Sequence, residues 1–203
     1  NLTENEAKAL YLMLLNSMRF NMAITFPEDG PDFQDEFFSP RNREYKFRGE
    51  ISDVGRGIYS FIPSSGRLNT RLEYLGKLYK TITGRNDGSG ECRRLLGEIW
   101  KDLTRNWTSK SGIYSFSKSK DGVLYKLDYR YWRVIHPNTS PWFICDRCGV
   151  IVPSSVRGVC PTFGCNGNLT QIDQQKLMEL ERNHYRYLYT HLMPITMVSH
   201  EHT

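Results

Sequence analysis

The sequence predicts an α+β protein, and three observations support this fold class. Apolar residues recur at helical spacing near both ends of the chain and again in its centre. The hydrophobic period then changes from 3.6 to 2 over residues 112–135, where two β-prone runs flank Asp121-Gly122. Two short-spaced pairs of cysteines follow between residues 145 and 165. We therefore expect helices and a β-hairpin, joined to a small unit organised by cysteines.

The first 65 residues are expected to form a helix and an irregular segment that packs on the core. Thr3 and Glu6 fit a capping box, and the apolar spacing that follows predicts an amphipathic helix from residue 4 to about residue 22. Residues 26–65 contain an acidic stretch together with prolines and glycines, which predicts loops or short strands.

Residues 66–139 are expected to form a winged-helix-like domain. A second helix is predicted to end at Gly84, and a third carries apolar residues from Leu95 to Leu103 on one face. Cys92 lies near this face, so we interpret it as a buried thiol rather than a metal ligand. Two helices joined by a short turn and followed by a hairpin are typical of a winged helix, in which the hairpin is the wing.

Basic and aromatic residues alternate along the predicted wing, and basic residues recur on the third helix. Such a mixture can pair with phosphates and stack on bases, although it also describes any half-buried antiparallel strand. The candidate nucleic-acid contacts are Arg93, Arg94, Lys101, Arg105, Lys118, Lys120, Lys126, Arg130 and Arg133. The net charge of +5 is compatible with a polyanionic partner such as DNA, or with an ordinary solvated surface.

The cysteines of residues 140–171 predict a zinc ribbon with one structural Zn²⁺. Cys145 and Cys148 form a C-x2-C pair, Cys160 and Cys165 form a C-x4-C pair, and eleven residues separate the pairs. Two cysteines at such spacing can turn both sulfurs toward one tetrahedral ion. Four cysteines would leave no position open for water, which argues against a catalytic zinc.

Two disulfides in a secreted domain are the alternative interpretation of these cysteines. The sequence contains four N-x-S/T sequons, but nothing in it resembles a signal peptide, and 203 residues can bury a core without disulfides. We therefore expect a reducing, cytoplasmic compartment. No apolar run approaches the ~20 residues that a membrane span requires, so no membrane contact is expected.

Residues 172–203 are expected to contain a helix over residues 172–192 and a short apolar strand, ITMVS. The chain stops soon after this strand, which suggests a piece of a larger protein. A terminal metal site at His200 and His202 is the alternative, although no third ligand is evident.

A resemblance becomes visible once these segments are placed in order. The stretches WFICDRC, GVCPTFGCNGNL, NHYRYLY and SHEHT resemble the region ahead of the second RecA-like domain in large bacterial DEAD/DEAH-box helicases of the MrfA and DISARM DrmA kind. This resemblance covers residues 142–203 by motif and residues 66–135 by pattern only. It implies a winged-helix insertion and a cysteine cluster beside an ATP-dependent helicase motor.

The chain itself lacks a Walker A motif, G-x4-G-K-[ST], and we expect it to bind no ATP and to catalyse no reaction. We therefore expect a non-catalytic accessory domain of a helicase polypeptide, with a structural zinc ion and a DNA-contacting wing. The alternative is a docking module of a defence or repair complex, in which the winged helix binds a partner protein and does not contact nucleic acid.

Overall fold

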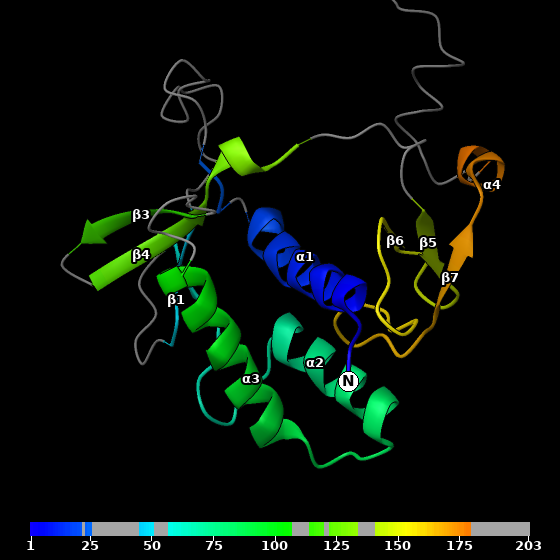
Figure 1. The fold of residues 1–203 in the computed structure, drawn as a ribbon, viewed down its shortest axis with the longest axis horizontal. Coiled ribbons are helices and arrows are strands. Elements are labelled where there is room, and N and C mark those ends of the chain that lie inside the picture. Colours follow the sequence, from blue (N-terminus) through cyan, green and yellow to red (C-terminus); the bar gives the residue numbers. More distant parts are fainter. Residues whose placement is uncertain are drawn as a thin grey trace, which may run out of the picture.

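The computed structural model describes residues 1–21, 23–25, 45–50, 57–106, 114–119, 122–133 and 141–179. These ranges contain four α-helices and two small β-sheets, in agreement with the predicted α+β class (Figure 1). In the described residues, no helix is both long enough and apolar enough to cross a bilayer.

Helix α1, Glu4–Phe20, begins with the predicted capping box. The backbone N–H of Glu6 donates to Thr3 Oγ1 at 3.3 Å, and the N–H of Thr3 donates to Glu6 Oε2 at 2.8 Å. Each bond satisfies a donor that the first turn of a helix would otherwise leave free. The buried face of α1 consists of Leu10, Met13, Leu14, Leu15 and Met18.

Helices α2, Thr70–Thr83, and α3, Ser89–Lys101, form the predicted helix pair. The side chain of Asn69 caps α2 by accepting the N–H of Leu72 at 2.9 Å. Gly84 ends this helix in the left-handed conformation with φ of 72°, as its position in the sequence predicts. Helix α3 continues into one turn of π-helix, η1, over Asp102–Asn106.

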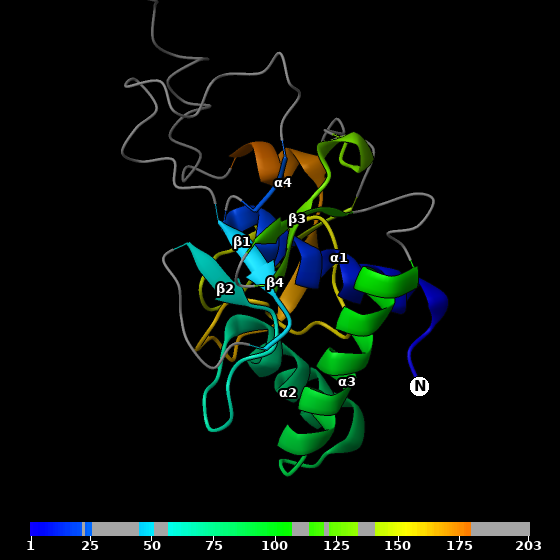
Figure 2. The same ribbon diagram turned by 90° about the vertical axis from the view of Figure 1, so that its left-hand side faces the viewer.

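The first sheet contains the hairpin and two short strands from the N-terminal third of the chain. Its order is β2 (Ile58–Ser60), β1 (Lys46–Arg48), β4 (Gly122–Leu127) and β3 (Tyr114–Ser119). Strand β1 pairs in parallel with β2 and antiparallel with β4, so the short strands expected within residues 26–65 extend the hairpin (Figure 2).

The hairpin formed by β3 and β4 is shorter than the segment predicted for it, residues 112–135. The Asp128 side chain accepts the N–H of Arg130 at 3.1 Å, and this bond starts a 3-10 turn, η2, over Tyr129–Tyr131. An aspartate that bonds the backbone two residues ahead favours a turn over a continued strand.

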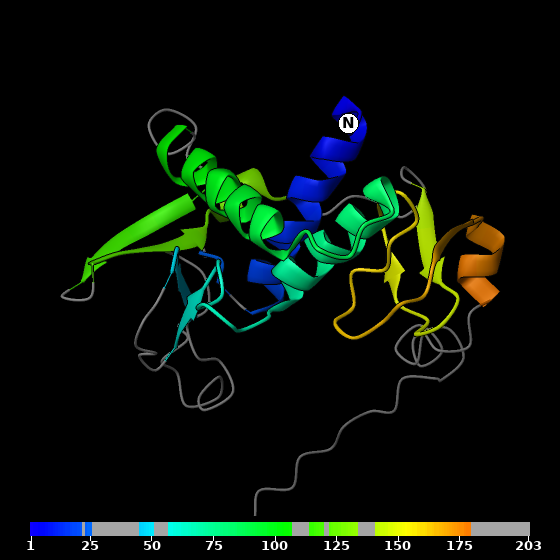
Figure 3. The same cartoon turned by 90° about the horizontal axis from the view of Figure 1, so that it is seen from below.

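The second sheet is formed by the cysteine-containing segment. Its order is β6 (Ile151–Val152), β5 (Trp142–Cys145) and β7 (Leu169–Ile172), with both pairings antiparallel. The helix predicted over residues 172–192 begins later than expected, because Ile172 is the last residue of β7, and its described part is α4, Gln174–Glu179. The predicted strand ITMVS and the terminal histidines lie outside the described residues. The second sheet and the β3–β4 hairpin lie at opposite ends of the molecule, with α1, α2 and α3 between them (Figure 3).

A buried arginine joins three elements of the helical unit. Arg71 of α2 is only 6% exposed, and its guanidinium donates to the carbonyls of Phe61 and Ser60 at 2.9 and 2.8 Å and to Ser17 Oγ at 2.6 Å. It also lies over the rings of Phe47 and Phe61, 5.0 and 4.9 Å from their centroids. Because these partners are buried or half-buried, Arg71 is the polar link between α1, β2 and α2.

We predict that Arg71→Met destabilises the fold by about 3 kcal/mol, because it leaves several polar groups without partners in a site with little water. Urea denaturation measures this change. Lys80→Met on the same helix is the control, since Lys80 is exposed and its loss should change the free energy of unfolding by less than about 0.5 kcal/mol. Equal effects of the two substitutions would contradict the structural role of Arg71.

Candidate metal centre

The two cysteine pairs converge on one point beside the second sheet. Cys145 is the last residue of β5, Cys148 lies in the following turn, and Cys160 and Cys165 precede β7. All four Sγ atoms lie within 4.8 Å of one another. The Cys145–Cys165 and Cys148–Cys160 Sγ distances are 3.7 and 3.6 Å. A tetrahedral ion with Zn–S bonds of ~2.3 Å needs sulfurs about 3.8 Å apart, so the cluster can hold a metal ion and suits zinc.

The structure does not support the disulfide alternative. All five cysteines are free. The shortest sulfur distances given above exceed the ~2.05 Å of a disulfide bond by more than an ångström.

The first cysteine pair is held in a tight turn by backbone bonds. The N–H of Gly149 donates to the carbonyl of Cys145 at 3.1 Å, and the N–H of Arg147 donates to Cys145 Sγ at 3.5 Å. Gly149 has a φ of 69°, a left-handed conformation that glycine adopts without steric cost.

The second pair is held in the same manner. The N–H of Cys165 donates to the carbonyl of Thr162 at 3.1 Å, and the N–H of Gly167 donates to Cys165 Sγ at 3.4 Å. Gly164 supplies the left-handed residue, with φ of 73°. Backbone N–H groups directed at sulfur favour the thiolate, which is the form that binds metal.

Gly167 is required for its lack of a side chain rather than for a turn conformation. Its φ lies outside the left-handed region, so it does not supply a special turn. Instead, a Cβ at this position would lie 2.5 Å from Cys145 Sγ and 2.6 Å from both Arg147 Cβ and Asp146 Oδ1. The absence of a side chain allows the two cysteine turns to approach each other.

The four thiols differ in burial and in acidity. Cys145, Cys160 and Cys165 are buried, whereas Cys148 is exposed. Burial raises the pKa of Cys160 to about 12, while a hydrogen bond with Thr162, whose Oγ1 lies 3.5 Å from the sulfur, lowers the pKa of Cys148 to about 6. Cys160 therefore keeps its proton at neutral pH until a metal ion displaces it, so metal binding must release protons.

The cysteine-containing segment is fixed to α1 by a charged contact that sequence reasoning did not identify. Arg157 has a φ of 52°, and its Nε lies 2.6 Å from Glu6 Oε1. Its Nη2 also donates to the carbonyl of Asn1 at 3.3 Å. The two residues that form the ion pair are about 150 positions apart in sequence, so no local pattern could indicate it.

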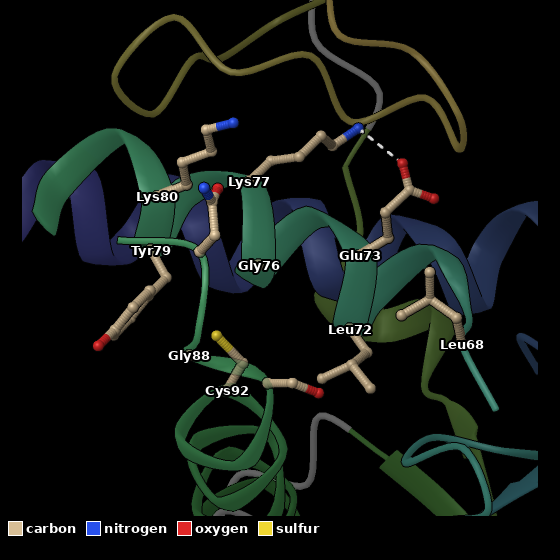
Figure 4. A pocket seen from close by; sticks show the side chains of 11 residues that line it. Leu68, Leu72, Glu73, Gly76, Lys77, Tyr79, Lys80, Gly88 and Cys92 are labelled. Atoms are coloured by element: carbon tan, nitrogen blue, oxygen red, sulfur yellow. Dashed lines mark ion pairs between the residues drawn. The ribbon is translucent and has the colours of Figure 1, made fainter. Parts of the chain in front are cut away.

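Cys92 lies away from the cluster. It is 3% exposed on α3 and contributes to the wall of a pocket of about 280 Å³ between α2 and α3 (Figure 4). Its burial confirms the prediction of a buried thiol. Among the described residues, only the four clustered cysteines form a group of three or more potential ligands that could hold a metal ion.

The basic residues predicted to contact nucleic acid lie in different surroundings. Arg94, Lys101 and Arg105 are exposed along α3 and η1, and Arg133 is exposed after η2. Lys101 has a nearby carboxylate, since its Nζ lies 3.5 Å from Glu98 Oε1.

Arg93 and Arg130 are engaged in contacts within the protein. Arg93 donates to the carbonyls of Pro63, Ser64 and Arg67. Arg130 forms a fork with the buried carboxylate of Asp128, with Nε 2.9 Å from Oδ1 and 3.1 Å from Oδ2.

The remaining candidates are Lys118, Lys120 and Lys126, which the sequence places on the predicted wing. Lys126 is half-buried on β4. Lys118 belongs to β3, but its side chain, and the whole of Lys120, lie outside the described part of the structure. The nucleic-acid role of all nine residues stays a prediction.

The sequence matches no protein-family model, and no curated protein or solved structure is significantly similar to it.

We predict that Gly167→Ala weakens metal binding at least tenfold, because the added methyl group would separate the two cysteine turns. Competition with a chromogenic chelator measures the affinity for zinc. Gly76→Ala is the matched control, since a Cβ at Gly76 meets no atom within 4 Å and the substitution removes a glycine from the interior of α2. Equal zinc affinity of the two variants would show that the close approach at Gly167 has no effect on the site.

Proposed function

We propose that this chain is a non-catalytic accessory module of a DNA helicase, built from a winged-helix-like unit and a structural zinc ribbon. The observation that carries this proposal is the α2–α3 pair followed directly by the β3–β4 hairpin, with β1 added to the hairpin as a third strand. A winged helix uses the second helix of such a pair and the adjacent hairpin to contact DNA.

Zinc is the proposed ion of the cysteine cluster. Four thiolates are soft ligands that select zinc over magnesium or calcium, and a closed four-sulfur shell is typical of structural sites. The function of the ion is then to fold the segment around it, since structural zinc sites contribute their binding free energy to folding. Free thiols in such a site suit a reducing compartment, which supports the expected cytoplasmic location.

The proposed DNA surface consists of α3, η1 and the hairpin. Arg94, Lys101 and Arg105 are the exposed basic residues of α3 and η1, and Lys118 and Lys120 would extend the surface along the wing. Arg93 and Arg130 are less suited to phosphate contact, because breaking their internal bonds would offset part of the gain.

The helicase assignment rests on the resemblance of residues 142–203 to the region ahead of a RecA-like domain. The arrangement of the elements supports it, because the hairpin and the ribbon lie at opposite ends of the helices. In this proposal the hairpin end contacts DNA, and the ribbon end contacts the remainder of the helicase polypeptide. ATP hydrolysis would belong to that remainder, since the chain lacks the Walker A motif.

A protein-docking role is the second candidate, and the charge of α3 favours it. The exposed charged residues of α3 and η1 are three basic and three acidic: Arg94, Lys101, Arg105, Glu91, Glu98 and Asp102. Leu95 is also 47% exposed among them. A mixed surface of this kind attracts a polyanion less strongly than it suits a protein partner.

We predict that the zinc-loaded protein binds a fluorescent DNA duplex with single-stranded ends in about 50 mM salt, and that affinity falls steeply as salt rises, because phosphate contacts release counterions. Replacing both Arg94 and Lys101 by glutamate should weaken binding at least tenfold and reduce the slope of log K against log salt by about 2. Fluorescence anisotropy measures both quantities.

Lys80→Glu is the control for this experiment, since Lys80 is an exposed lysine of α2 outside the proposed surface. An absence of binding by the folded, zinc-loaded protein in ~50 mM salt would contradict the DNA proposal and favour the docking role.

A further inference from the structure

Side chains of helix α2 hydrogen-bond to the backbone of the loop that carries the second pair of cysteines. Lys77 Nζ donates to the carbonyl of Thr162 at 2.9 Å and to the carbonyl of Cys165 at 3.0 Å. One of these carbonyls belongs to a cysteine of the cluster and the other to the residue whose hydroxyl lies beside Cys148. Lys77 therefore acts on the backbone that sets the position of the sulfurs.

Glu73 completes this contact one helical turn earlier. Its Oε1 accepts the N–H of Gly164 at 2.8 Å and lies 3.2 Å from Lys77 Nζ. The two side chains are 15% and 16% exposed, so the pair is largely shielded from water. Figure 4 shows both side chains on the edge of α2 that faces the loop, joined by their ion pair. Three backbone groups of the loop, two carbonyls and one N–H, are thus satisfied by α2.

We propose that α2 forms the outer part of the metal centre, in which Lys77 and Glu73 position the loop that carries Cys160 and Cys165. This inference rests on the proposed zinc site. Three hydrogen bonds between two side chains of one helix and one ligand loop distinguish this arrangement from ordinary surface packing. The zinc affinity of the cysteines then depends on residues about 85 positions earlier in the chain.

The groups around a metal ligand influence the affinity of the site for its ion. Groups that hydrogen-bond to ligands or hold them in place typically change metal affinity 10- to 100-fold when they are removed. Displacement of the loop should also change the angles between the sulfur atoms, which the absorption spectrum of the Co²⁺-substituted protein reports.

The test uses the full chain and the variants Lys77→Met and Glu73→Ala, with Lys80→Met as the exposed lysine control on the same helix. Zinc affinity is measured by chelator competition, and the Co²⁺ spectrum is recorded for each variant whose circular dichroism matches that of the unchanged protein. Lys77→Arg is included because it restores a cationic donor and should recover part of the affinity.

We expect Lys77→Met and Glu73→Ala each to bind zinc about tenfold more weakly and to change the Co²⁺ spectrum, and Lys80→Met to change neither. Should Lys77→Met fail to fold, Glu73→Ala tests the same loop contact through its zinc affinity. Unchanged affinity and an unchanged spectrum in metal-loaded variants would overturn the role of α2 while leaving the zinc site intact. An unchanged protein that binds neither zinc nor Co²⁺ would overturn both this inference and the zinc proposal.

Discussion

The convergence of four cysteine sulfurs within 4.8 Å is the constraint on which the second half of the structure depends. Four thiolates cannot share so small a volume without a cation, because their mutual repulsion grows as water is excluded. The strands around them have only two to four residues, too few to form a stable sheet of their own. A bound cation would offset the negative charge of the thiolates, and it would stabilise the short strands by joining the two cysteine turns.

The cysteine-containing segment is not an independent unit, because charged contacts join it to the helices on two sides. Arg157 pairs with Glu6 at the start of α1, and Lys77 bonds the loop between Cys160 and Cys165. Arg71 in turn links α1, α2 and β2. Stabilisation from the proposed zinc ion would therefore extend through α2 into the helical unit, and the cysteine-containing segment is not expected to unfold on its own when the ion is removed.

The sequence predicted the features that depend on neighbouring residues. The Thr3–Glu6 capping box and the Gly84 helix end are set by a few adjacent side chains, and the cysteine spacing alone identified the four cysteines whose sulfurs converge. Features that depend on distant residues were missed. The Lys77 contact with the cysteine loop spans 85 and 88 positions, and the need for glycine at residue 167 arises from the Cys145 turn across the sheet. The hairpin ends before the predicted residue 135, because the side chain of Asp128 favours a turn over further strand.

Zinc-edge X-ray absorption of the purified protein is the decisive measurement, because it reports the identity, number and distance of the atoms bound to the ion. We expect one zinc per chain, surrounded by four sulfur atoms at ~2.3 Å. A nitrogen or oxygen ligand at ~2.0–2.1 Å in place of a sulfur would contradict it, as would well under one zinc per chain.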